Sequence, residues 1–149
     1  MRIVVQRVSE ASVTVKEPQY FSRINKGMLL LLGVKEGDTE EDLIFTADKC
    51  SNLRIFEDEN EKMNLSIKET GGEILIISQF TLYGDSRKGN RPSFVEAARP
   101  EFAKVMYEKF IERIKSNIGD DKVKCGVFGA MMLVKIFNDG PVTLIIDSK

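Results

Sequence analysis

Three groups of polar residues interrupt apolar stretches of this 149-residue chain, and they carry its candidate chemistry. They are Ser78-Gln79-Phe80-Thr81, Arg87-Lys88-Gly89-Asn90-Arg91-Pro92-Ser93-Phe94 and Asn138-Asp139-Gly140-Pro141-Val142-Thr143. The first group offers hydroxyl, amide and backbone N–H donors for an oxyanion, or a hydroxyl nucleophile. The second is basic and suited to phosphate. The third contains a Gly-Pro pair just ahead of a β-branched run, which is either a turn between strands or a contact with a substrate.

Each group also has a purely structural interpretation. Ser78 and Thr81 can satisfy backbone groups at the end of a strand. The basic segment can be a solvated surface loop, and the Gly-Pro pair can be a simple turn. An X-Pro bond is cis in only about 5–6% of folded cases, so the dipeptide alone does not predict its isomer.

The residue types that are missing exclude several mechanisms. The chain has no histidine, which rules out Ser-His-Asp and Cys-His catalysis and leaves no imidazole base. Cys50 and Cys125 match no redox or metal spacing, and we expect both to be buried free thiols. Two distant cysteines do not fill a zinc shell. The sequence therefore predicts no metal and no cofactor.

Period-2 and continuous apolar patterns predict mostly β structure around these groups. The expected strands cover 2–8 and 13–15 as a hairpin, 28–34 as a buried strand, 53–56, 73–82, 123–128, 131–137 and 142–146. Segment 57–62 is expected to be a solvated loop.

Two segments have helical spacing. One helix is expected from Asp38, and a second from Pro100 in its first turn. The apolar stripe predicted for the second consists of Phe102, Val105, Met106, Phe110, Ile114 and Ile118. We therefore predict an α+β fold: a single compact domain, residues 1–149, with curved, barrel-like β-sheets and two main amphipathic helices.

Composition sets the broad class of the protein. Hydrophobic residues make up 42% and charged residues 30% of the chain, which is typical of a globular domain. No window approaches the roughly 18 apolar residues of a membrane span, and the first residues read as a strand rather than a signal peptide. We expect a cytoplasmic protein. A net charge of −1 argues against an extended nucleic-acid interface but permits a small RNA footprint.

The three groups, in this order and at this spacing, resemble the bacterial-type D-aminoacyl-tRNA deacylases, the D-Tyr-tRNA deacylase family. The resemblance rests on "SQFTLYGD", "RKGNRPSF" and "NDGPVT". It extends over "RIVVQRVSEASVTV", "GMLLLLGV", "RIFEDENEKMNLS", "GGEILIISQFTL" and "GAMMLVKIFNDGPVT", and so over nearly the whole chain.

The resemblance implies a homodimer with active sites at the subunit interface. Each subunit of the family inserts a cis Gly-Pro into its partner's site, where the carbonyls hold the substrate's α-amino group and exclude an L side chain. Gly140 and Pro141 match this dipeptide. Met131 and Met132 match positions that contact the terminal adenosine, although flexible methionines also fill cores.

The implied activity is hydrolysis of the ester bond of D-aminoacyl-tRNA, and of glycine mischarged on alanine tRNA, in chiral proofreading of translation. Ser78, Gln79, Phe80 and Thr81 match the catalytic motif. In the family's favoured mechanism the 2′-hydroxyl of the terminal ribose activates water; a hydroxyl nucleophile at Thr81 or Ser78 is the alternative, and it needs a base. An activated ester needs placed water and oxyanion stabilisation more than a strong nucleophile.

Two further expectations complete the prediction. Arg87, Lys88 and Arg91 are candidates for contact with tRNA phosphates. The alternative to a hydrolase is a dimeric tRNA-end-binding protein of the same fold without activity, because a fold does not guarantee its function.

Overall fold

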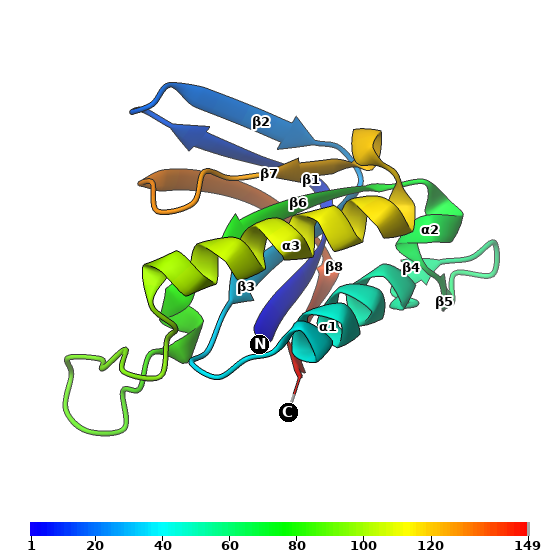
Figure 1. Ribbon diagram of the computed structural model, residues 1–149. Helices are drawn as coiled ribbons and strands as arrows, with labels where there is room; N and C mark the ends of the chain where they lie inside the picture. Colours follow the sequence, from blue (N-terminus) through cyan, green and yellow to red (C-terminus); the bar gives the residue numbers. More distant parts are fainter. Residues whose placement is uncertain (149) are drawn as a thin grey trace.

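The computed structural model describes residues 1–148, and a curved sheet is its central feature. The strand order is β2-β1-β3-β6-β7, with β8 paired to the other edge of β1 (Figure 1). The six strands are β1 (Arg2–Val15), β2 (Tyr20–Ile24), β3 (Gly27–Gly33), β6 (Glu73–Ser78), β7 (Val123–Cys125) and β8 (Met132–Asp147). The predicted α+β class with a barrel-like sheet is confirmed.

The expected hairpin over 2–8 and 13–15 is wrong, because both runs belong to the single strand β1. Residues 9–12 contain no glycine, proline or asparagine, so the chain lacks a turn there. The strand bends instead. Its pairing with β8 shifts register between Gln6 and Val8 and between Val8 and Glu10. The first half of β1 pairs with β3 and the second half with β2.

The strand predicted over 28–34 is confirmed as the centre of the sheet. β3 pairs in parallel with β6 and antiparallel with β1, and both of its faces are covered. Met28 and Leu30 face the main core, and Leu29 faces a second, smaller core. The two strands approach closely at Gly27, where a Cβ atom would lie 1.8 Å from the carbonyl oxygen of Glu73. Only glycine fits there.

Helices α1 (Glu40–Asn52) and α3 (Pro100–Ile118) cover one face of this sheet (Figure 1). Thr39 caps α1 in a capping box with Asp42, and Pro100 begins α3, so both predicted helices are confirmed. The remaining helical turns are α2 (Ile67–Thr70), η1 (Phe80–Tyr83) and η2 (Asp120–Lys122).

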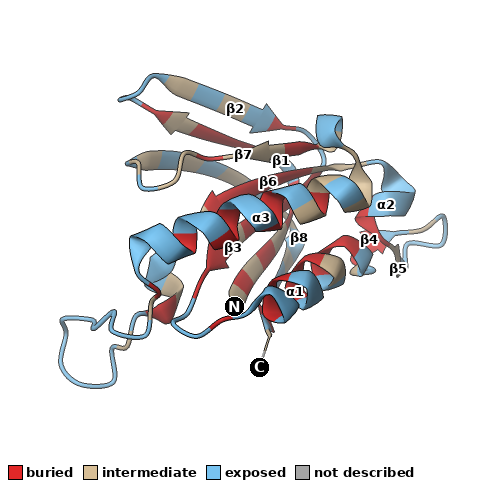
Figure 2. Ribbon diagram, in the orientation of Figure 1, coloured by how far each residue is buried: buried red, intermediate tan, exposed pale blue. Residues whose placement is uncertain are grey.

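The predicted apolar stripe of α3 is partly wrong. Phe102 and Val105 are exposed. The face that contacts the sheet and α1 consists of Ala103, Met106, Tyr107, Phe110, Ile111 and Ile114. Burial alternates with exposure along the same helix (Figure 2). The stripe is therefore rotated toward Tyr107, whose hydroxyl lies 2.9 Å from the carbonyl oxygen of Ile76.

Two of the predicted strands in the middle of the chain have other bounds in the structure. The strand expected over 53–56 is reduced to β4 (Phe56–Glu57), which pairs with β5 (Met63–Leu65) around the predicted loop. The strand expected over 73–82 ends at Ser78, because η1 begins at Phe80.

The C-terminal half departs from the predictions as well. β7 covers only Val123–Cys125, and the runs 131–137 and 142–146 join into β8. Both cysteines are free thiols, but only Cys50 is buried; Cys125 is half-buried. No helix among the described residues is long and apolar enough to cross a membrane.

Candidate active site

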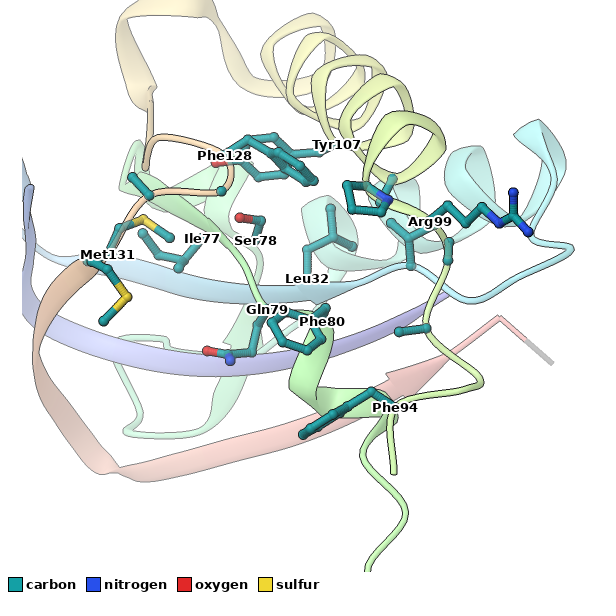
Figure 3. Close-up of a pocket in the computed structure, with 18 of the residues that line it drawn as sticks. Leu32, Ile77, Ser78, Gln79, Phe80, Phe94, Arg99, Tyr107, Phe128 and Met131 are labelled. Carbon is teal, nitrogen blue, oxygen red and sulfur yellow. The ribbon is translucent and has the colours of Figure 1, made fainter. Parts of the chain in front are cut away.

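A cavity of about 680 Å³ opens between the end of β6, the start of α3 and the loop that precedes β8. Ser78, Gln79 and Phe80 form one wall, and Met131 lies on another (Figure 3). Met132 also lines the cavity. The volume is within the range of small-molecule sites, roughly 300–1,000 Å³. The structure thus brings together five of the residues that the sequence predicted for the site.

The wall at Ser78 changes direction because β6 gives way to a helical turn. The N–H of Gln79 still donates to the carbonyl of Leu32 at 2.7 Å, which continues the sheet by one bond. The backbone N–H groups of Phe80 and Thr81 then open η1, so they have no partner inside that turn. Backbone donors without a partner in the turn are the kind of group that stabilises an oxyanion, and of these two residues Phe80 lines the cavity.

Thr81 is exposed and is not among the residues that line the cavity. The side-chain amide of Gln79 donates a hydrogen bond to the Thr81 hydroxyl, which links the threonine to the wall. The carbonyl of Thr81 accepts from the N–H of Gly84 at 2.9 Å and closes the turn. Thr81 therefore lies beside the cavity rather than inside it.

The cavity holds no general base. Among the residues that line it, all within 1–148, Arg99 and Tyr107 are the only ionisable ones. Burial raises the pKa of the Tyr107 hydroxyl, so it stays protonated near neutral pH. Its hydroxyl also lies 3.1 Å from the carbonyl of Gly126, in addition to that of Ile76. Tyr107 is thus engaged in holding strands rather than in proton transfer.

The two methionines differ in environment. Met131 is 92% exposed at the rim of the cavity. Met132 is half-buried and packs against the smaller of the two cores. A Cβ atom on Gly126 would lie 2.6 Å from the Met132 sulfur. Met132 therefore fills the core as well as lining the cavity, whereas Met131 is available to a ligand.

Gly140 and Pro141 do not line the cavity of their own chain. They lie in a bulge of β8: Gln6 pairs with Thr143 and Val8 with Asn138, so four residues of β8 oppose Arg7 alone. The Gly140-Pro141 peptide bond is cis. Asn138 closes the base of the bulge by donating its side-chain amide to the carbonyls of Arg7 and Val142, at 3.2 and 3.1 Å.

Arg7 supports this bulge and was not predicted. Its side chain is buried, with a residue exposure of 6%, and donates to the carbonyls of Ile55 at 2.8 Å and Asp139 at 3.2 Å. A Cβ atom on Gly140 would lie 2.9 Å from its Nη2 atom. A signal existed in the sequence, because strand alternation places Arg7 on the same face as Ile3 and Val5. A buried arginine needs hydrogen-bond partners.

The basic loop lies outside the cavity as well. Asp85 and Ser93 pair through two backbone hydrogen bonds of 2.7 and 2.8 Å, which close the loop at its base. Arg87 makes two hydrogen bonds to the Asp85 carboxylate and lowers the pKa of that carboxyl to about 2. Lys88 and Arg91 are exposed and make no ion pair within residues 1–148. Of the three cations in this loop, these two are therefore the ones available to bind a ligand.

No cluster of three or more histidine, cysteine, aspartate or glutamate side chains within residues 1–148 is arranged to hold a metal ion. The cavity combines hydrogen-bond donors at one wall with no carboxylate, histidine or lysine among the residues that line it. An α+β fold with such a cavity is suited to an enzyme that acts on an already activated acyl group.

Comparison with known proteins identifies the family. The family model described as D-Tyr-tRNA(Tyr) deacylase matches residues 4–147. D-aminoacyl-tRNA deacylases of Koribacter versatilis and Bacillus velezensis are 56% and 55% identical over 149 residues, which is 100% of this chain and 98% and 99% of those proteins. The chain belongs to the D-Tyr-tRNA(Tyr) deacylase family and is a hydrolase acting on carboxylic ester bonds.

Solved structures agree with the fold. A structure described as a c-Myc DNA Unwinding Element Binding Protein is 43% identical, covers 100% of this chain and 99% of its own, and has a TM-score of 0.94. A probable eukaryotic D-amino acid tRNA deacylase is 18% identical, covers 98% of both chains and has a TM-score of 0.85, which shows a shared fold.

Proposed function

We propose that this chain hydrolyses the ester bond of D-aminoacyl-tRNA and rejects L-aminoacyl-tRNA through Gly140 and Pro141 of a second subunit. One observation carries the proposal: Gly140 and Pro141 do not line the cavity of their own chain, whereas the motif at Ser78 does. Because the bulge lies outside the cavity of its own chain, its carbonyls can enter the cavity of a partner subunit.

The exposed face of β8 supports a homodimer. β8 pairs only with β1, so its other edge has no strand partner within residues 1–148. Leu133, Phe137 and Ile145 are exposed along this strand, and Met131 is exposed just before it. A long apolar edge strand is a pairing surface unless it is covered. A second copy covers it and brings the two bulges toward the two cavities.

Chiral selection in this proposal depends on the backbone. The carbonyls of Gly140 and Pro141 accept hydrogen bonds from the substrate's α-amino group, and the space left beside the α-carbon admits hydrogen but not an L side chain. The side chain of a D residue points away and need not be held. Several D-amino acids and glycine, including glycine on alanine tRNA, then become substrates.

The chemical step needs an oxyanion site and a placed water. We assign the N–H groups of Phe80 and Thr81, with Ser78 and Gln79 beside them, to the oxyanion. The terminal 2′-hydroxyl of the tRNA activates the water. The lack of a base within the cavity supports this route over a nucleophilic Thr81 or Ser78, since a hydroxyl nucleophile requires one.

The basic loop is assigned to the tRNA backbone. Lys88 and Arg91, and Arg87 once it leaves Asp85, are placed to neutralise two or three phosphates. Residues 1–149 form the whole deacylase domain in this proposal, and the enzyme works in the cytoplasm, where aminoacyl-tRNA is used.

The test is a comparison of D-Tyr-tRNA, L-Tyr-tRNA and Gly-tRNA as substrates of the purified protein. We expect rapid hydrolysis of the D-Tyr and Gly esters and little of the L-Tyr ester. Comparable cleavage of L-Tyr-tRNA contradicts the chiral filter. Binding of D-Tyr-tRNA with no hydrolysis of any ester supports the alternative, a tRNA-end-binding protein without activity.

A further inference from the structure

Two exposed aromatic rings lie at the mouth of the cavity. Phe80 is 57% exposed and Phe94 is 37% exposed, and their ring centroids are 5.2 Å apart in an edge-to-face arrangement. Figure 3 shows Phe94 beyond Phe80, on the side away from Tyr107 and Ser78. Apolar rings left in solvent beside a cavity indicate a surface that a ligand covers.

The fold holds Phe94 in this place. The paired residues Asp85 and Ser93 close the basic loop, and Phe94 follows the second of them directly. A Cβ atom on Gly84 would lie 2.9 Å from the Cε1 atom of Phe94, so the glycine makes room for the ring. The carbonyl of Phe94 also accepts from the N–H of Ala97 at 3.1 Å. The backbone at Phe94 is therefore held in place, and its ring packs against Gly84 and Phe80.

Positive charge lies next to the rings. The loop between Asp85 and Ser93 carries three cations, Arg87, Lys88 and Arg91, against the single carboxylate of Asp85. The Asp85 carboxylate pairs with Arg87. The side chains of Lys88 and Arg91 are therefore left to bind a ligand. Aromatic rings beside unpaired cations are the combination that binds single-stranded nucleic acid, through base stacking and phosphate neutralisation.

We propose that Phe94, with Phe80 at its edge, is the stacking platform for the base of the nucleotide that precedes the terminal adenosine of tRNA. This inference rests on the proposed function, in which the aminoacylated adenosine fills the cavity. With that group held between Ser78 and Met131, the next nucleotide lies beside Phe94, which lines the cavity on the side away from Ser78 and Tyr107 (Figure 3). Its phosphate then faces the basic loop.

The platform has a defined role in the reaction. Stacking is tolerant of base identity, because every base has a π-face, so the platform places the 3′ end of any tRNA without selecting among them. It contributes to substrate binding and leaves the bond-breaking groups untouched. Its loss therefore raises KM and leaves kcat unchanged.

The test compares Phe94→Ala with Phe94→Trp on two substrates, D-Tyr-tRNA and D-tyrosyl-adenosine, which lacks the preceding nucleotide. We expect Phe94→Ala to raise KM for D-Tyr-tRNA roughly 5- to 150-fold, the range for loss of one stacked base. Phe94→Trp should keep the wild-type KM. Both variants should match wild type on D-tyrosyl-adenosine, because that substrate does not reach the platform.

A second experiment removes the base that is proposed to stack on the Phe94 ring. D-Tyr-tRNA with an abasic residue before its terminal adenosine should show a raised KM with wild-type enzyme, and Phe94→Ala should add nothing to it. An equal loss on D-Tyr-tRNA and D-tyrosyl-adenosine overturns the platform and assigns Phe94 to contact with the aminoacyl-adenosine itself. Unchanged KM on both also overturns it, as does an altered molar mass of Phe94→Ala, which would place the ring in a subunit interface.

A binding readout separates this inference from the proposed function. 2-Aminopurine in place of the base before the terminal adenosine of an uncharged tRNA should lose fluorescence on stacking with the wild-type protein. Phe94→Ala should not quench it. Quenching without hydrolysis of any ester contradicts the proposed activity and keeps the platform, whereas hydrolysis without quenching overturns the platform and keeps the activity.

Discussion

Among single residues, Thr81 and Gly140 test the two halves of the proposed chemistry. Thr81 lies beside the cavity and receives a hydrogen bond from Gln79, with no base among the residues that line the cavity. Gly140 lies in a bulge against the buried guanidinium of Arg7. One residue concerns how the ester is attacked, and the other concerns which enantiomer is admitted.

Thr81→Val should keep measurable deacylation of D-Tyr-tRNA, lowered by no more than about 100-fold, because the substitution removes a hydroxyl but not the backbone donors of η1. Single-turnover kinetics with D-Tyr-tRNA measures the rate, and circular dichroism controls for folding. Complete loss of activity in a folded variant would identify Thr81 as the nucleophile.

Gly140→Ala should lower kcat/KM for D-Tyr-tRNA by about 100-fold or more, since a displacement near 1 Å at a positioning group has effects of that size. The new Cβ atom meets Arg7 Nη2 at 2.9 Å, and the φ of 120° is unfavourable for alanine. Gly37→Ala, outside the cavity and the basic loop, is the matched control: it also has positive φ, at 83°, but nothing lies within 4 Å of its added Cβ atom. Equal kinetics for the two variants would contradict the role of the bulge.

Among the elements, the basic loop and β8 have separate tasks. The loop closed by Asp85 and Ser93 is exposed, lies outside the cavity and carries an excess of positive charge. β8 follows β1 along its length, and its bulge separates two regular stretches. Electrostatics dominates the first element and strand pairing the second, so salt affects them differently.

Arg91→Ala should weaken binding of tRNA and make the slope of log K against log salt concentration less negative by about 0.7 to 1, the loss of one phosphate contact. Filter binding of uncharged tRNA between low and moderate salt gives the slope. Lys49→Ala removes the same charge from the exposed face of α1 and should leave it unchanged. An unaltered slope for Arg91→Ala excludes this residue from the interface.

At the scale of the whole molecule, the exposed face of β8 is the surface that the proposed dimer covers. Phe137 lies at the middle of that face, close in sequence to the bulge. In the proposed function, a second copy on this face completes each cavity with the Gly140-Pro141 pair of its neighbour. Chiral selection then depends on formation of the dimer.

Phe137→Glu should shift the protein from dimer to monomer and abolish D-Tyr-tRNA hydrolysis together, because a charge would be buried at the interface without a partner. Light scattering across a dilution series, with activity at the same concentrations, measures both. Phe45→Glu on α1 is the matched control, since Phe45 is 50% and Phe137 56% exposed. An active Phe137→Glu monomer would contradict the shared site.

The sequence alone determined the features that depend on local pattern. Continuous apolar residues in β3, the capping box at Thr39 and Pro100 at the start of α3 are short-range signals, and each predicted its element. The motif at Ser78 pointed to the family because its residues are contiguous. The cavity wall formed by Ser78, Gln79 and Phe80 could therefore be predicted from the sequence.

Only the tertiary structure decided the features made by pairing of distant segments. β1 is one strand rather than a hairpin because β8 runs along it, and Arg7 is a support of Gly140 because the bulge of β8 opposes it. The rim formed by Phe80 and Phe94 likewise requires the bridge between Asp85 and Ser93. Local propensity contains no information on which strand edge meets which, since register is set by the packing of the whole sheet.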